Sequence, residues 1–410
     1  MTPLGWAVAF IITLSFFVFV TFFGRLPAFR RTPIAGLYKL LWIHIPNAAL
    51  ALDKIVTAGR LSRSLASFAH FVMHDRHPTV VVFFIAIMVV AEYLFLPDAW
   101  PHLGPMTKLS VLVVVALPYV FLALACAADP GYITASNHAY HMSLFPYDHA
   151  IFHPGHHCRT CDFIKPPRSK HCSICKRCIA KADHHCIFIN SCVGYGNHHW
   201  FLLLLVSTAL LTSYGSVLGI SLLNVVIRAR FPDWALLKPR AISWDRYLAI
   251  WGWALQRYVR LGATTLLATL TSPLIWGLFI YTFYLVYSGT TTNESLKWSF
   301  FKEDMADGFV FSRTFVPTSN MDPPFCRRWP IQPERILVAT DGEPPPHNSP
   351  LPGEGEWERV WSLKNVDNIY DLGLRDNLAD AFVKNYAFGS LFHDPPAERN
   401  RPIRTLGRRL

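Results

Sequence analysis

The chain has few charged residues for its length. Asp, Glu, Lys and Arg make up only 16% of the 410 residues, and 52% of the sequence is hydrophobic. Ordinary soluble domains carry about 25% charged residues, so this composition excludes an ordinary soluble enzyme. Charges are missing above all from a few long runs. Each of these runs is long enough to cross a bilayer core of about 30 Å at about 1.5 Å per residue.

Five such runs predict membrane-spanning helices. They are Leu4–Phe23, Thr79–Pro97, Leu109–Ala128, Trp200–Ile227 and Leu261–Tyr287. Any one of them alone is compatible with a buried helix of a soluble protein, but five in one chain indicate a polytopic membrane protein. A sixth stretch, Pro33–Leu52, contains Lys39, His44 and Pro46, and it is expected to lie at the membrane interface.

No lysine or arginine precedes the first run, which is unlike a secretory signal peptide. Arg25, Arg30 and Arg31 follow the run instead. The run is therefore predicted to be an uncleaved span that starts outside the cytosol. With five spans, three parts of the chain are then predicted to be cytosolic: 25–78, 129–198 and the tail after Tyr287.

Cysteine is scarce outside one segment. Seven of the nine cysteines lie between Cys158 and Cys192, and the other two are Cys126 and Cys326. The segment reads C-x2-C, x9, H-C-x2-C-x2-C, then Asp-His-His-Cys, then x5-C. Two tetrahedral zinc sites need eight thiolate or imidazole ligands. The segment offers eight: Cys158, Cys161, Cys172, Cys175, Cys178, Cys192, His171 and His185. This count leaves Cys186 free beside a histidine, which makes it a candidate nucleophile.

Two alternatives concern the surroundings of this segment. His153, His156 and His157 lie just before it, and one of them supplying a zinc ligand stays open. The segment is also basic enough to suggest nucleic acid. Its position between two predicted spans instead favours anionic lipid or the phosphates of coenzyme A, so no nucleic-acid partner is expected.

The segment resembles the cysteine-rich domain of the DHHC protein S-acyltransferases, or palmitoyltransferases. Asp183-His184-His185-Cys186 matches the four-residue signature of that family. The other matches are Lys165–Arg168 (KPPR), Asn197, Phe201, Asp129-Pro130-Gly131, Thr291–Glu294 (TTNE) and Asn377. The resemblance covers 129–294 firmly and the tail loosely.

The resemblance implies a division of labour within the segment. Cys158, Cys161, His171 and Cys178 would hold one structural zinc, and Cys172, Cys175, His185 and Cys192 the other. Asp183 would orient His184, and His184 would take the proton from Cys186. Cys186 would then accept an acyl chain from palmitoyl-coenzyme A and pass it to a cysteine of a membrane-associated protein.

The overall likeness favours the fungal endoplasmic-reticulum branch of the family, which acts on transmembrane SNAREs. The resemblance therefore implies an endoplasmic-reticulum membrane protein with a cytosolic zinc domain and C-terminus. A different class stays open, namely a catalytically idle membrane scaffold that is held together by zinc. Formation of an acyl-enzyme would separate the two.

The basic loop 228–260 disagrees with this orientation, because basic loops favour the cytosolic side. Thiol chemistry decides against that rule, since a thiolate-rich zinc module belongs in a reducing compartment. A re-entrant element at Trp251–Leu255 would make the basic loop less anomalous, and it stays open.

The predicted fold is an α-helical polytopic membrane protein of about five transmembrane helices with a cytosolic double-zinc cysteine-rich domain. Four parts are predicted: an N-terminal membrane region with three spans (1–128), the cytosolic DHHC zinc domain (129–199), two C-terminal spans with a lumenal loop (200–288) and a cytosolic tail (289–410). Within the tail, Glu343–Gly355 is proline-rich and predicts a loop. Val360–Phe382 is expected to pack a short helix, and the basic end Glu398–Leu410 to touch anionic lipid.

Overall fold

A computed structural model describes residues 32–237, 242–316, 329–346 and 351–384, together with a few isolated positions outside these ranges. The chain divides into two compact units. One comprises Met1–Arg76 and Lys238–Gln256, and the other His77–Leu237 and Arg257–Leu410. The predicted first span, Leu4–Phe23, and the basic end, Glu398–Leu410, lie almost wholly outside the described residues.

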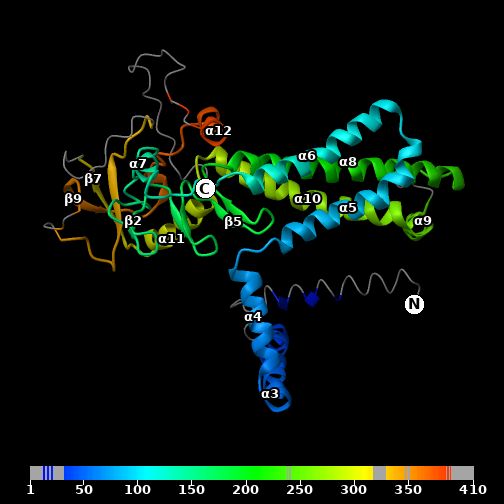
Figure 1. Ribbon diagram of the computed structural model, residues 1–410, viewed down its shortest axis with the longest axis horizontal. Coiled ribbons are helices and arrows are strands. Elements are labelled where there is room, and N and C mark those ends of the chain that lie inside the picture. Colours follow the sequence, from blue (N-terminus) through cyan, green and yellow to red (C-terminus); the bar gives the residue numbers. More distant parts are fainter. Residues whose placement is uncertain are drawn as a thin grey trace. The chain divides into compact units, whose positions relative to one another are not determined.

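In the larger unit, four helices are long and apolar enough to cross a membrane. They are α5 with its 3-10 extension (Thr79–Ala99, then Trp100–His102), α6 (Pro105–Ala127), α8 (His198–Arg230) and α10 (Val259–Tyr287). These are the four predicted spans that fall within the described part of the chain. Helix α8 packs against α6 and α10, and α10 also packs against α5 (Figure 1). The chain is therefore a helical polytopic membrane protein.

Small and hydroxylated residues hold α8 against α10. A Cβ atom placed on Gly219 would lie 2.0 Å from Oγ1 of Thr265, so the two backbones approach closely at this point. Ser213 bonds Ser272 at 2.8 Å, and Ser216 bonds another hydroxyl of α10 at 2.7 Å. Small residues and interhelical hydrogen bonds are typical of helix contacts in membranes, where lipid is as apolar as the side chains.

The cysteine-rich segment between α6 and α8 forms three short antiparallel hairpins. They are β1–β2 (His157–Cys158 with Phe163–Ile164), β3–β4 (Lys170–Cys172 with Arg177–Ile179) and β5–β6 (His184–Cys186 with Ser191–Val193). A short helix, α7 (His138–Met142), precedes them. Strands of two or three residues bury too little apolar surface to be stable alone, so cross-links such as bound metal ions would contribute most of their stability.

The tail contains more regular structure than its sequence predicts. Helix α11 (Thr292–Ala306) leads into a three-stranded antiparallel sheet in the order β8-β7-β9 (Arg335–Ala339, Val310–Thr314, Glu354–Arg359). One buried cluster joins α11 to this sheet, and it includes Trp298, Met305, Val310, Leu337 and Val360. A 3-10 turn (Leu363–Asn365) and helix α12 (Leu374–Phe382) follow. Helix α12 occupies only the last part of Val360–Phe382, and β9 begins at the end of the proline-rich loop.

The smaller unit contains short helices. They are α2 (Pro33–Lys39), a π-helical turn η2 (Leu40–His44), α3 (Ile45–Thr57), α4 (Arg60–His74) and α9 (Trp244–Arg257). Helices α3 and α4 lie side by side as a hairpin (Figure 1). Ala58 and Gly59 both have positive φ at its turn (55° and 74°), and Asp53 caps α4 by accepting from the amide of Ser62 at 2.8 Å.

Candidate active site and zinc sites

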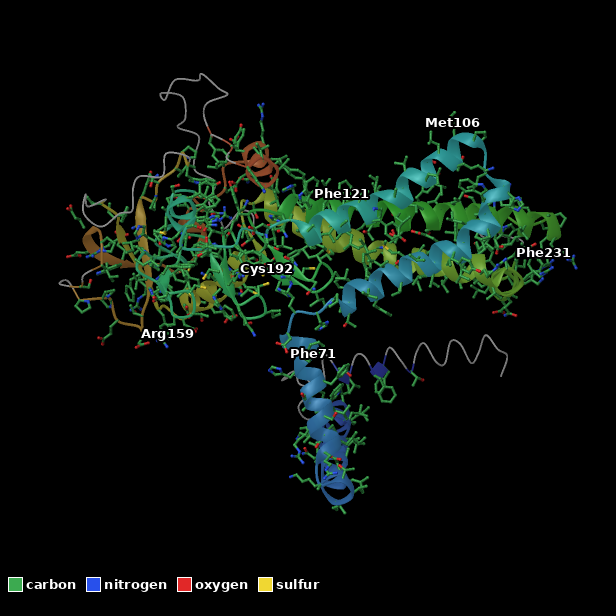
Figure 2. The ribbon with its side chains drawn as sticks, in the orientation of Figure 1. Phe71, Met106, Phe121, Arg159, Cys192 and Phe231 are labelled. Carbon is green, nitrogen blue, oxygen red and sulfur yellow. The ribbon has the colours of Figure 1, made fainter. Side chains whose placement is uncertain are left out.

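The hairpin register brings the metal-ligating residue types together in pairs. His171 lies opposite Cys178 in β3–β4, and His185 lies opposite Cys192 in β5–β6. Two cysteines of a C-x2-C turn lie beside each pair: Cys158 and Cys161 beside the first, and Cys172 and Cys175 beside the second. The result is two groups whose ligand atoms all lie within 4.8 Å of one another: Cys158, Cys161, His171 and Cys178, and Cys172, Cys175, His185 and Cys192. Figure 2 shows sulfur atoms gathered beside Cys192.

The distances within both groups suit a tetrahedral zinc ion. Nδ1 of His171 lies 3.4 to 3.8 Å from three sulfur atoms, and Nδ1 of His185 lies 3.4 to 3.7 Å from the other three. A tetrahedron with Zn–S of about 2.3 Å and Zn–N of about 2.0 Å has N···S edges of about 3.5 Å. Three thiolates and one imidazole leave no open position, which is typical of structural zinc. Each of these donor sets therefore fits one zinc ion.

The histidines just before the cluster lie elsewhere. His153 contacts the carbonyl of Ala150 at 3.0 Å, and His157 pairs with Asp162 at 3.4 Å. Among the described residues, the two convergent groups include neither of them, nor His156. That these histidines supply no ligand, and that the eight grouped residues hold zinc, both stay predictions.

The short strand β5 gives two adjacent histidines different surroundings. Successive side chains of a strand point to opposite faces. His185 points to the second cysteine group, so His184 and Cys186 share the other face of β5. His184 is within hydrogen-bonding reach of the Cys186 thiol. The alternation thus separates a metal-facing histidine from one that faces the candidate nucleophile.

Asp183 holds the His184 ring. The Nδ1–H of His184 donates to Oδ2 of Asp183 at 2.6 Å, which leaves Nε2 as the ring nitrogen for the thiol. Burial would raise the pKa of Asp183, but the hydrogen bond from His184 and nearby positive charge lower it to about 2. Burial would likewise lower the pKa of His184, but its bonds to Asp183 and Cys186 raise it to about 10. An imidazole with its pKa raised in this way can hold a proton beside the Cys186 sulfur.

Cys186 lies where the cysteine-rich module meets the membrane helices. It is buried in one apolar cluster with Leu122 and Ala125 of α6 and Phe201 and Leu205 of α8. Further along the bundle is a cavity between α5, α6, α8 and α10, lined mainly by apolar side chains, with Glu92, Tyr214 and three threonines among them. Its lining on α8 runs from Leu211 to Leu218, about 9 to 20 Å beyond Leu205 along the helix axis.

The TTNE segment after α10 joins the membrane helices to this site. Thr291 donates its hydroxyl to the carbonyl of Ala182 at 3.1 Å. The amide and hydroxyl of Thr292 both donate to the Asp183 carboxylate, at 2.5 and 3.1 Å. Thr291 and Glu294 also form a capping box that begins α11. The segment therefore fixes the aspartate that orients His184.

Arg168, the last residue of the KPPR element, is buried against the same segment. Its guanidinium makes two parallel bonds of 2.7 Å to the Glu294 carboxylate and one of 3.0 Å to the carbonyl of Gly289. It also stacks on Tyr370, 4.3 Å from the ring centre. Lys181 and Asp380 pair beside it at 2.6 Å. The sequence does not single out Lys181, Tyr370 or Asp380 as members of this group, because each has its partner at a distant position in the chain.

The remaining family-type residues are also placed by hydrogen bonds. Asp129 accepts from the amides of Gly131 and Tyr132 at 2.8 and 2.9 Å, which closes a turn after α6. Asn197 donates to the carbonyl of Cys192 at 2.9 Å. Asn377 donates to the carbonyl of Tyr287 at 2.9 Å and so holds α12 against the end of α10. All of these contacts lie around the base of the cysteine-rich module.

Comparison with known proteins agrees with this arrangement. Residues 151–299 match a family model described as DHHC palmitoyltransferase. The chain is 46% identical to Palmitoyltransferase SWF1 of Neurospora crassa, over 98% of this chain and 97% of that protein. It is 40% identical to Palmitoyltransferase swf1 of Emericella nidulans, over 92% and 96%. It is 33% identical to Palmitoyltransferase ZDHHC4 of Mus musculus, over 27% of this chain and 34% of that protein. The chain therefore belongs to the DHHC palmitoyltransferase family.

Proposed function

We propose that Cys186 is the nucleophile of this palmitoyltransferase and that Asp183 and His184 activate it. The observation that carries the proposal is the line of contacts from Thr292 through Asp183 and His184 to Cys186. This arrangement supplies a nucleophile, a base and an orienting carboxylate. Two zinc ions held by the eight ligands would act structurally, because these ligands would leave neither ion an open coordination position.

The reaction has two steps. The Cys186 thiol gives its proton to His184, and its sulfur attacks the thioester carbonyl of palmitoyl-coenzyme A. The carbon–sulfur bond to coenzyme A breaks, its thiolate leaves and takes up a proton, and an acyl-enzyme remains. A cysteine thiolate of the substrate protein then attacks the new thioester and releases Cys186.

The surroundings of Cys186 support a long-chain acyl donor. Each CH₂ group buried away from water contributes about 0.8 kcal/mol, so a sixteen-carbon chain needs an apolar site. The cluster around Cys186 and the cavity beyond it both lie between the membrane helices. A chain attached to Cys186 would enter the bundle along α8.

We also propose a location and a substrate class for this palmitoyltransferase. The module and the tail face the cytosol, where thiols stay reduced, and the site opens at the cytosolic surface of the endoplasmic reticulum membrane. The acceptors are then cysteines of membrane-anchored proteins, and we propose transmembrane SNAREs among them. Support comes from the likeness to the fungal palmitoyltransferases. Co-expression with a SNARE that has a cysteine beside its membrane span should acylate that cysteine, and a SNARE that stays unmodified would contradict this substrate class.

The central experiment measures acyl-enzyme formation. Purified full-length protein incubated with labelled palmitoyl-coenzyme A should gain a hydroxylamine-sensitive label. Cys186→Ser should lose the label and retain about two zinc per chain. Cys126→Ser is the matched control, because Cys126 packs against the same apolar cluster and should keep the label. Labelling of Cys186→Ser at the wild-type level would place the nucleophile elsewhere. A wild-type protein without label would favour the idle scaffold.

A further inference from the structure

The α3–α4 hairpin has an apolar stripe, and no described residue of the smaller unit covers it. Six large apolar side chains of the two helices are 56% to 81% exposed: Leu52, Ile55, Val56, Leu61, Leu65 and Phe68. Ile55 and Val56 follow Leu52 by three and four residues, and Leu65 and Phe68 follow Leu61 by four and seven, so they form one stripe per helix. Isolated helices of this length are only marginally stable in water, and the hairpin therefore needs an apolar partner along this stripe.

The polar side of the hairpin is basic. Lys54, Arg60 and Arg63 lie close to its turn, and the carboxylate of Asp53 is turned inward to the amide of Ser62 and the hydroxyl of Thr57. Helices with one apolar face and a basic polar face lie in the headgroup region of a bilayer and favour anionic lipids. The charge of this hairpin therefore complements an anionic membrane surface.

The length and position of the hairpin also favour a bilayer surface. Helix α3 has 13 residues and α4 has 15, about 20 and 22 Å, which is short of a bilayer core of about 30 Å. Crossing part-way would place the basic turn in hydrocarbon, which is costly. Only residues 75–78 separate α4 from α5, a candidate membrane span. These residues can extend at most about 18 Å, so α4 ends near the membrane.

We propose that the α3–α4 hairpin lies flat in the headgroup region of the membrane, with its apolar stripes against the acyl chains and its basic face toward anionic lipid headgroups. It would hold the connection between the first predicted span and α5 to the membrane surface. This inference does not depend on the acyltransferase activity, so the two can fail separately.

The test uses pairs of positions on opposite faces. Leu52 and Lys54, like Leu65 and Ser67, are two residues apart and so about 200° apart around a helix. A spin label carried by a genetically encoded keto amino acid leaves the zinc cysteines untouched. Each of the four positions would be labelled singly in the full-length protein. The protein would be reconstituted in phosphatidylcholine vesicles with and without phosphatidylserine.

Oxygen, which concentrates in lipid, and a water-soluble nickel chelate then report the surroundings of each label. Positions 52 and 65 should favour oxygen, and positions 54 and 67 should favour nickel. Nickel access at all four positions would overturn the proposal. Shielding of 52 and 65 from both reagents would mean that protein covers the stripe, and oxygen access at all four would mean that the hairpin crosses the bilayer. Either result would also overturn it.

The preference of the hairpin for anionic lipid is tested by comparing the two vesicle types. Immersion of positions 52 and 65 should increase when phosphatidylserine is present, and Lys54→Glu with Arg60→Glu should remove that increase. Equal immersion in both vesicle types would overturn the part of the proposal that concerns anionic lipid.

Discussion

At the scale of single residues, the alternation of strand β5 determines the chemistry. His184 and His185 are chemically identical neighbours, yet one faces Cys186 and the other faces three sulfur atoms. A composition-based prediction treats them alike. The spacing of the cysteines and the family resemblance distinguish them, because both the eight-ligand count and the DHHC signature assign His185 to metal.

His184→Ala and His185→Ala should therefore fail in different ways. His184→Ala removes the base and should slow acyl-enzyme formation by about 10²- to 10⁴-fold, with two zinc per chain retained. His185→Ala removes a ligand and should lower the zinc content and the stability of the module. Elemental analysis and the rate of acyl labelling check the two outcomes. If zinc is lost from His184→Ala and retained in His185→Ala, the roles are reversed.

The buried ion pair of Arg168 and Glu294 joins the module to α11. Glu294→Gln should destabilise the module by about 3–5 kcal/mol, because it leaves the buried guanidinium with Asp380 as its charged neighbour, 3.9 Å away and shared with Lys181. The temperature at which zinc is released to a chromogenic chelator measures this effect. Glu358→Gln is the matched control, since Glu358 pairs with Arg335 at the surface and such pairs contribute at most about 1 kcal/mol. Equal effects of the two changes would contradict the structural role of the buried pair.

At the scale of elements, local sequence patterns predict the membrane helices well, but they do not predict which distant segments pair with one another. Thr79–Pro97 predicts a span, and α5 begins at the same residue and ends at Ala99. A hydrophobic run is a local property, so the sequence alone shows it. The sequence does not predict the sheet of β7, β8 and β9. Its strand β9 reads Glu354–Arg359 (EGEWER), which lacks apolar alternation, and it pairs with a strand about 40 residues away across a proline-rich loop. The contact of Arg168 with Glu294 was likewise beyond a local pattern.

The close approach of α8 and α10 beside Thr265 depends on Gly219. Gly219→Ala should lower stability by about 1–3 kcal/mol, because the new methyl group overlaps Thr265 and forces the helices apart. Gly277→Ala in α10 is the control, since nothing lies within 4 Å of its added Cβ. That change should be neutral or stabilising by up to about 1 kcal/mol. Thermal unfolding in detergent distinguishes them.

A double variant sharpens this prediction. Thr265→Ala removes the two outer atoms that the new methyl group meets, so adding it to Gly219→Ala should restore part of the lost stability. Loss of stability in the double variant equal to the sum of both single effects would show that the helices do not touch at this point.

At the scale of the whole molecule, hydrogen bonds constrain the membrane topology. Asp183 of the module bonds Thr292 after α10, and the Tyr370 hydroxyl of the tail donates to the carbonyl of Pro146 at 2.8 Å. Groups in direct contact lie on the same side of a membrane. The two candidate spans α8 and α10 separate the module from the tail, and an even number of crossings returns the chain to the side it left. The contacts and the number of spans therefore both place the module and the tail on the same side of the membrane.

This agreement predicts where glycosylation tags are modified. A tag at the C-terminus, or within residues 75–78, should stay unmodified if the module is cytosolic. Tags after Gly104, between α5 and α6, or beside Asp233, after α8, should be glycosylated, because one crossing separates each of these loops from the module. The basic residues of 228–260 favour the opposite result for the second loop, so the tag beside Asp233 is the decisive one. An unmodified tag there, with a modified tag after Gly104, would mean that α8 does not cross the membrane. A modified C-terminal tag would place the tail in the oxidising lumen, together with the cysteine-rich module that the tail contacts. Free thiolates persist poorly in that compartment.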